Sequence, residues 1–95
     1  MSGGTYGFRR FALVTDVEPD AEPIRYGIRC AVCEACGPVV EAVKESTEAA
    51  QEKANGEAKR RAAEWAAVHR GTHHDHYTYR CVEITPLRIV PGAWR

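Results

Sequence analysis

Cysteines and histidines gather in two short segments of the sequence. The first, "RCAVCEACG", holds Cys30, Cys33 and Cys36, and the second, "HRGTHHDHY", holds His69, His73, His74 and His76. Thiolate and imidazole are preferred ligands of zinc, and structural sites commonly combine a C-x₂-C turn with two ligands at or near a helix end. The two segments therefore predict one structural Zn²⁺ ion, held by residues far apart in the sequence.

The spacing alone leaves the ligand set open. Cys30 and Cys33 have the C-x₂-C spacing, and so do Cys33 and Cys36. The pattern of the preceding segment favours the first pair, because Cys30 would point inward at the end of a strand. His69 is the expected third ligand, and the fourth is one of the three histidines that follow it: His73, His74 or His76.

A rival arrangement uses sulfur ligands only. Cys30, Cys33 and Cys36 form a three-cysteine run, and Cys81 is a remote fourth cysteine, as in some iron–sulfur proteins. This arrangement leaves the histidines without a role. Cys81 on its own is most simply a small apolar residue in a strand. The simplest alternative to a metal site is that all the cysteines are ordinary buried thiols.

Three segments have the pattern of strands. Residues 8–17 are apolar on both faces, and in residues 24–30 apolar side chains alternate with Arg25, Gly27 and Arg29. The alternation directs Tyr26, Ile28 and Cys30 to one face. Residues 77–90 are rich in aromatic and β-branched residues and form a third strand, interrupted or bent at Pro86.

A long helix is expected between the second and third strands, over residues 43–70. Eight residues recur at spacings of three or four and share one stripe: Val43, Thr47, Ala50, Ala54, Ala58, Ala62, Trp65 and His69. The Asn55-Gly56 pair is a place where the helix could break. Gly71 is expected to be its left-handed cap.

These elements predict a small α+β domain of order ββαβ, with an antiparallel sheet of about three strands packed on one long helix. The chain has 95 residues, which fits a single domain over 1–95. We expect 1–7 to be flexible and 38–56 to be an insertion or a helix extension. A core of this size is marginal, so a bound metal would stabilise it.

The charge balance is neutral, with 13 basic and 13 acidic residues. Neutrality argues against non-specific binding of nucleic acid. The sequence carries no recognisable secretion signal and no apolar run that could span a bilayer. We therefore expect a cytoplasmic protein with no membrane contact, where closely spaced cysteines are more often metal ligands than disulfide partners.

The motifs "RCAVC", "WAAVH" and "HYTYR" resemble an uncharacterised family of small actinobacterial zinc-finger-like proteins, and the likeness covers most of the chain. The resemblance implies Cys30, Cys33, His69 and His76 as ligands, with Trp65 as a core residue. The chain departs from the family at Glu34, where a glycine is usual, and in a longer segment over 34–56. Further cysteines and histidines are extra: Cys36, Cys81, His73 and His74.

Four ligands including two thiolates make a poor Lewis acid, so we expect a structural site and no enzyme activity. The predicted function is a regulatory module that binds a protein partner or a second copy of itself. The alternative is a nucleic-acid-binding zinc-finger protein, if seven basic side chains form one patch: Arg9, Arg10, Arg25, Arg29, Lys59, Arg60 and Arg61.

Overall fold

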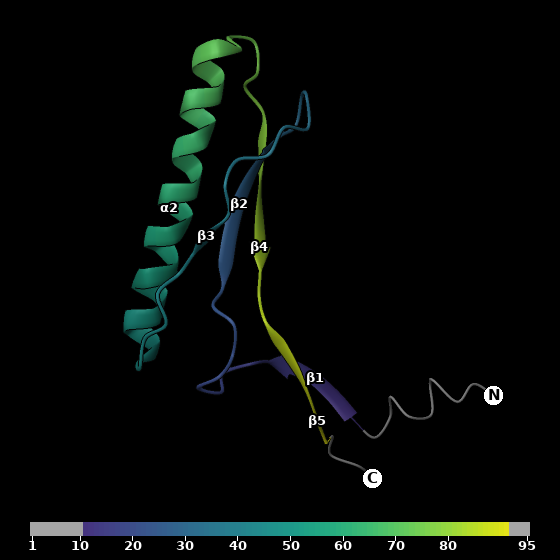
Figure 1. Cartoon of the computed structure of the whole chain (residues 1–95), viewed down its shortest axis with the longest axis vertical. Coiled ribbons are helices and arrows are strands. Elements are labelled where there is room, and N and C mark those ends of the chain that lie inside the picture. The colour runs from purple at the N-terminus through teal and green to yellow at the C-terminus, as the bar shows by residue number, and fades with distance from the viewer. Residues whose placement is uncertain (1–10, 92–95) are drawn as a thin grey trace, which may run out of the picture. The chain divides into compact units, whose positions relative to one another are not determined.

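The computed structural model describes residues 11–91 (Figure 1). The chain divides into two compact units, one formed by Pro23–Ile84 and the other by Met1–Glu22 with Thr85–Arg95. The expected flexibility of residues 1–7 and the beginning of the first predicted strand at residues 8–10 lie outside the described residues. The prediction of one domain over residues 1–95 stays a prediction.

Three antiparallel strands form the sheet of the larger unit. They are β2 (Arg25–Cys30), β3 (Val40–Glu41) and β4 (Tyr79–Ile84), in the order β3-β2-β4. The predicted alternation in β2 is confirmed, since Tyr26, Ile28 and Cys30 are all buried. The strand therefore ends with the thiol of Cys30 in the interior.

The helix α2 (Glu48–Thr72) covers one face of this sheet and contacts β2 and β3 (Figure 1). It begins later than predicted, because the Thr47 side chain caps it by accepting a hydrogen bond from the Ala50 N–H at 3.1 Å. Val43 therefore lies before the helix and is exposed. The helix runs unbroken through Asn55-Gly56.

The predicted C-cap at Gly71 is wrong. Gly71 lies inside α2, and the helix ends at Thr72 with His73 as its C-cap, whose backbone N–H donates to the His69 carbonyl at 3.0 Å. No glycine among the described residues has a positive φ angle. The helix therefore extends one residue past Gly71 and brings Thr72 and His73 close to His69.

The core of the larger unit is built from small helix residues against large strand residues. Ala58 and Ala62 of α2 are buried against Tyr26 and Ile28 of β2, together with Ala42. Alanine has no side chain beyond Cβ, so the helix can approach the sheet closely. The predicted stripe is thus the packed face of α2 from Ala58 onward.

The second unit contains a two-stranded antiparallel sheet. Its strands are β1 (Phe11–Thr15) and β5 (Leu87–Pro91), with Leu13 opposite Ile89. Arg88 donates to Asp16 and to Asp20, each at 2.8 Å. The interruption predicted at Pro86 is confirmed, because the chain leaves β4 after Ile84 and begins β5 at Leu87.

The predicted fold class is confirmed as a small α+β structure with one helix among residues 11–91 and antiparallel sheets. The sheet composition differs in one respect, because β3 is the third strand beside β2 and β4, whereas β1 pairs with β5. Residues 38–56 contain β3, the approach to the helix and the beginning of α2, and their status as an insertion or a helix extension stays a prediction. Within the described part of the chain, no helix is long and apolar enough to cross a membrane.

Candidate metal centre

The cysteine half of the site is a tight turn at the end of β2. Cys30 is the last residue of the strand and is fully buried, whereas Cys33 lies in the turn and is exposed. The Glu34 N–H donates to the Cys30 carbonyl at 2.9 Å, and the Cys30 N–H donates to the Ala35 carbonyl at 2.8 Å. These bonds hold both thiols on the same side of the turn.

The histidine half is the end of α2 and the loop that follows. His69 lies in the last turn of the helix on its buried face. The His76 N–H donates to the His73 carbonyl at 2.9 Å, which folds the loop back over the helix end. His76 thereby returns to the neighbourhood of His69, although it lies outside the helix.

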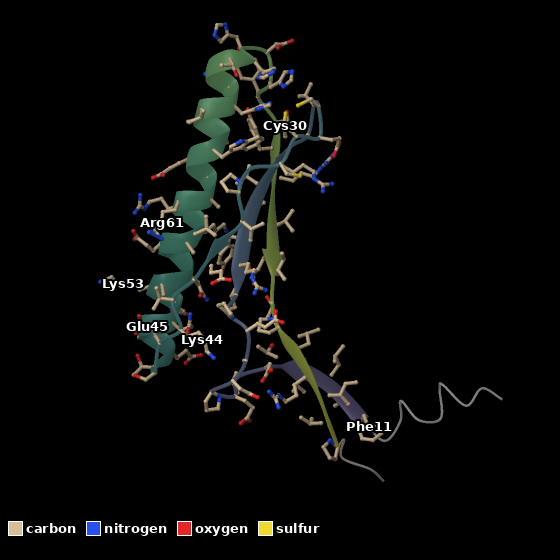
Figure 2. All side chains as sticks on the ribbon, viewed as in Figure 1. Phe11, Cys30, Lys44, Glu45, Lys53 and Arg61 are labelled. Atoms are coloured by element: carbon tan, nitrogen blue, oxygen red, sulfur yellow. The ribbon has the colours of Figure 1, made fainter. Side chains whose placement is uncertain are left out.

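The two halves meet at one point. Cys30 Sγ lies 3.4 Å from His76 Nδ1, Cys33 Sγ lies 3.4 Å from His69 Nε2, and the two histidine nitrogens are 3.2 Å apart. All four ligand atoms lie within 4.8 Å of one another. Figure 2 shows Cys30 at the end of β2 that faces the C-terminal end of α2.

These distances fit a tetrahedral ion. With ordinary zinc bond lengths, the sulfur-to-nitrogen edge of a tetrahedron is about 3.6 Å and the nitrogen-to-nitrogen edge is about 3.3 Å. The two sulfur-to-nitrogen distances of 3.4 Å and the nitrogen-to-nitrogen distance of 3.2 Å are within a few tenths of an ångström of these edges. Cys30, Cys33, His69 and His76 are therefore positioned to bind a metal ion.

The surroundings favour the metal-binding forms of two of these groups. Burial raises the pKa of the Cys30 thiol, but hydrogen bonds from the backbone of Cys33 and Val32 outweigh it and leave that pKa below its ordinary value. Burial, followed by the proximity of His73 and His76, lowers the pKa of His69. Thiolate and neutral imidazole are the forms that ligate a metal.

Aromatic rings support the buried histidine. The ring of Trp65 stacks on that of His69, with centroids 4.7 Å apart, and Tyr79 meets both rings edge-on. The predicted placement of Trp65 one turn before His69 is confirmed, and its side chain is partly buried against the core. The Tyr79 hydroxyl is buried without a hydrogen-bond partner among the described residues, so its ring contributes mainly by packing.

The alternative ligands lie outside the cluster. Cys36 and Cys81 are both exposed; Cys36 pairs with Arg29 in an isolated bridge, and Cys81 lies within β4. The four cysteines therefore do not come together as an iron–sulfur site would require. Cys81 lies in a strand, as predicted, but it is exposed.

The two extra histidines have other contacts. His73 stacks on His69 with centroids 4.3 Å apart and lies 2.9 Å from the Thr72 hydroxyl. His74 contacts the Gly71 carbonyl at 2.9 Å. Both residues belong to the rim of the site, outside the group of four.

Sequence reasoning missed the backbone role of two residues beside the site. Glu34 has a φ angle of 65°, in the left-handed region that favours glycine. Gly37 lies so close to Trp65 that a Cβ atom there would be 2.8 Å or less from three Trp65 side-chain atoms. The glycine that the resembling family usually has in place of Glu34 was a signal for the left-handed backbone at this position. Nothing in the sequence indicates the close approach of Gly37 to Trp65.

The left-handed backbone at Glu34 can be tested by two substitutions that remove the same carboxylate. Glu34→Gly should stay within about 1 kcal/mol of the wild-type free energy of unfolding, because relief of strain offsets the lost surface ion pairs. Glu34→Val should destabilise by about 1–3 kcal/mol, since a β-branched residue is strained there. Urea unfolding of the metal-loaded protein measures both, and equal stability of the two variants would contradict the argument.

Comparison with models of known protein families identifies the family of this chain. The model of one family, described as a domain of unknown function (DUF7848), matches residues 1–94. The chain belongs to that family. Searches of curated proteins and of solved structures gave no match. The zinc-finger-like pattern and the actinobacterial origin that the motifs suggested stay predictions, so the geometry of the site is the main guide to the function of this DUF7848 protein.

Proposed function

We propose that this protein is a non-enzymatic module stabilised by one structural zinc ion, and that it binds a protein partner in a regulatory role. The observation that carries the proposal is the convergence of Cys30, Cys33, His69 and His76 within 4.8 Å, with three of the distances between them close to the edges of a tetrahedron. Two thiolates and two imidazoles suit zinc better than hard cations, which prefer oxygen ligands.

The donor set supports a structural role rather than catalysis. A hydrolytic zinc ion keeps an open position for water and normally has three protein ligands. Four side chains here would complete a tetrahedron, and two of them would be thiolates, which reduce the acidity of the metal. Asp75 is the only carboxylate in the histidine loop. Its side chain is 92% exposed, and its nearest contact there is with His76 Nε2 at 3.8 Å, the ring nitrogen other than the one that lies near Cys30.

Zinc at this position would connect elements whose fully buried helix contacts are small side chains. The helix packs on β2 mainly through Ala58 and Ala62, which bury little apolar area. Ligation would join the end of β2 to the end of α2 and to the loop before β4. Binding energy would then be folding energy, as in other small metal-stabilised domains.

The face of the sheet opposite α2 offers an apolar docking surface. A depression of about 130 Å³ there is lined chiefly by Gly27, Val39, Val82 and Ile84. The three aliphatic side chains around the glycine are 43–54% exposed. The volume is close to that of the roughly 150 Å³ cavity that accommodates a benzene ring, so one large apolar side chain of a partner would fit.

The charges beside this depression indicate what should flank that side chain. Arg29 and Arg80 share the single carboxylate of Glu34, at 3.6 Å and 3.3 Å. One carboxylate cannot neutralise two guanidinium groups, so positive charge remains at this edge. We therefore infer a protein segment that carries an apolar side chain next to an acidic one.

Two basic residues of the expected patch are paired with carboxylates, which favours a protein over nucleic acid as the partner. Arg25 pairs with Glu41, and Arg60 pairs with Glu57 and Glu64. Arg9 and Arg10 lie outside the described residues. All four cysteines are described and free, which supports placing the protein in a reducing compartment such as the cytoplasm.

Site-specific photo-crosslinking tests the docking surface. A benzophenone amino acid at Val39, beside the depression, should capture one protein in cells, whereas the same probe at Val68 should not. Val68 is a suitable control because it is 68% exposed on the helix.

The captured protein, once purified, should lose binding on Val82→Asp and bind about tenfold more weakly on Arg29→Ala, with Val68→Asp unchanged. Binding that survives Val82→Asp, or a probe at Val39 that captures only nucleic acid or a second copy of the chain, would overturn the assignment. One zinc per chain by elemental analysis tests the metal independently.

A further inference from the structure

The two thiols of the metal centre differ sharply in access to solvent. Cys33 lies in the turn after β2 and is exposed, whereas Cys30 is fully buried at the end of the strand. On the proposed function, on which the following inference rests, both are thiolates. An exposed thiolate reacts with oxidants, and a buried one next to it can resolve the product.

We propose that Cys33 is an oxidation site at which a peroxide releases the zinc ion. The Cys33 thiolate attacks one peroxide oxygen, the O–O bond breaks, and Cys33 becomes a sulfenic acid while hydroxide leaves. The Cys30 thiolate then attacks the Cys33 sulfur, and the S–O bond breaks as the S–S bond forms. Two thiolates, one peroxide and two protons give one disulfide and two waters, with both sulfurs oxidised and both oxygens reduced.

The geometry of the turn suits this disulfide. Cys30 and Cys33 are three positions apart in one tight turn, and their sulfur atoms lie within 4.8 Å of each other. The turn is closed by the Glu34 N–H bond to the Cys30 carbonyl at 2.9 Å. Bond formation therefore requires side-chain rotation within one turn rather than movement of one element past another.

Oxidation would remove half of the ligands in a single reaction. Only His69 and His76 would remain, and two imidazoles fall short of the four ligands of a structural zinc site. The end of α2 and the loop at residues 73–77 would lose their connection to β2. Because the packing of Ala58 and Ala62 alone stabilises the helix only weakly, we expect α2 to unfold, and a thiol reductant with zinc to restore it.

Two other cysteines provide matched controls. Cys36 and Cys81 are exposed but lie outside the cluster, so Cys36→Ser combined with Cys81→Ser leaves only the two ligand thiols. The experiment treats the full-length, zinc-loaded double variant with one equivalent of hydrogen peroxide. A chromogenic chelator follows the zinc, and mass spectrometry locates the oxidised sulfurs.

The expected result is release of one zinc per chain, the loss of two hydrogens in mass, and a peptide linking Cys30 to Cys33. Dithiothreitol with zinc should reverse all three changes. Adding Cys33→His supplies a nitrogen ligand in place of the exposed thiolate, and zinc should then stay bound at the same peroxide dose.

The failures of the two proposals are distinguishable. A protein that holds one zinc and keeps it after the peroxide is consumed overturns the oxidation site and leaves the structural zinc in place. Zinc released by oxidation to sulfinic acid, without the disulfide, also overturns it. A protein that purifies without bound zinc and does not take it up overturns the proposed function itself, and the oxidation inference with it.

Discussion

Cys30→Ser is expected to abolish stoichiometric zinc binding and to unfold most of α2. Cys30 is the most buried ligand and connects the strand to the site. Structural zinc contributes roughly 10–16 kcal/mol in finger peptides, whereas a core of this size supplies only about 3–5 kcal/mol. Removal of one thiolate should therefore cost more stability than the rest of the unit provides.

The same substitution at Cys36 is the matched control. Cys36→Ser also replaces a cysteine sulfur by oxygen, but at an exposed residue outside the cluster. It should leave both the zinc content and the helix content unchanged. Elemental analysis and far-ultraviolet circular dichroism measure the two properties together. Addition of a strong chelator to the wild-type protein should reproduce the Cys30→Ser spectrum, and a helix that survives both treatments would refute a zinc-dependent fold.

The sequence predicted the cysteine half of the site by simple geometry. Side chains alternate along a strand, so burial of Tyr26 and Ile28 required burial of Cys30 as well. The tight turn that brings Cys33 back follows from the C-x₂-C spacing. Cys36 has the same spacing from Cys33, and only the strand pattern separated the two pairs.

The histidine half was harder to predict. His69 shares the helical stripe with Trp65, so helical periodicity was enough to place it. His76 lies in an irregular loop whose path depends on the His76 N–H bond to the His73 carbonyl. No periodic pattern describes such a loop, and the choice of His76 over His73 and His74 depended on the family resemblance.

The pairing of strands was only partly predictable. β3 has only two residues, and it is a strand because it pairs with Arg25 and Tyr26. No local sequence pattern predicts so short a strand. β1 and β5 are apolar and β-branched, which indicates strands but not their partners. Sequence patterns report which residues favour extended backbone, whereas pairing is decided by contacts between distant segments.

The beginning of the helix shows how a cap can override a periodic pattern. Val43 fits the apolar stripe by spacing, but the Thr47 side chain satisfies the first turn of α2, and the Gln51 amide donates to the Val43 carbonyl at 2.9 Å. These side-chain bonds stabilise a non-helical approach to the helix. A stripe of apolar residues therefore overestimates helix length where a good cap follows.

Gly37→Ala is expected to be among the most damaging changes that leave every ligand intact. The added Cβ would lie 2.5 Å from Trp65 Cγ and 2.8 Å from Trp65 Cβ, and an atom next to the backbone cannot swing aside as a flexible side-chain end does. Trp65 must move, and the His69 ring stacked on it moves too. We expect a loss of about 1–3 kcal/mol in the free energy of unfolding and weaker zinc binding.

Gly56→Ala is the control that makes this loss interpretable. Gly56 lies within α2, and nothing is within 4 Å of a Cβ atom there, so alanine should stabilise the helix by about 0.5–1 kcal/mol. The same added methyl group thus has opposite effects at the two sites. Urea unfolding of the zinc-loaded variants measures their free energies of unfolding, and competition against a zinc indicator measures their affinity for zinc. If Gly37→Ala is as stable as wild type and binds zinc equally well, the close approach to Trp65 does not position His69.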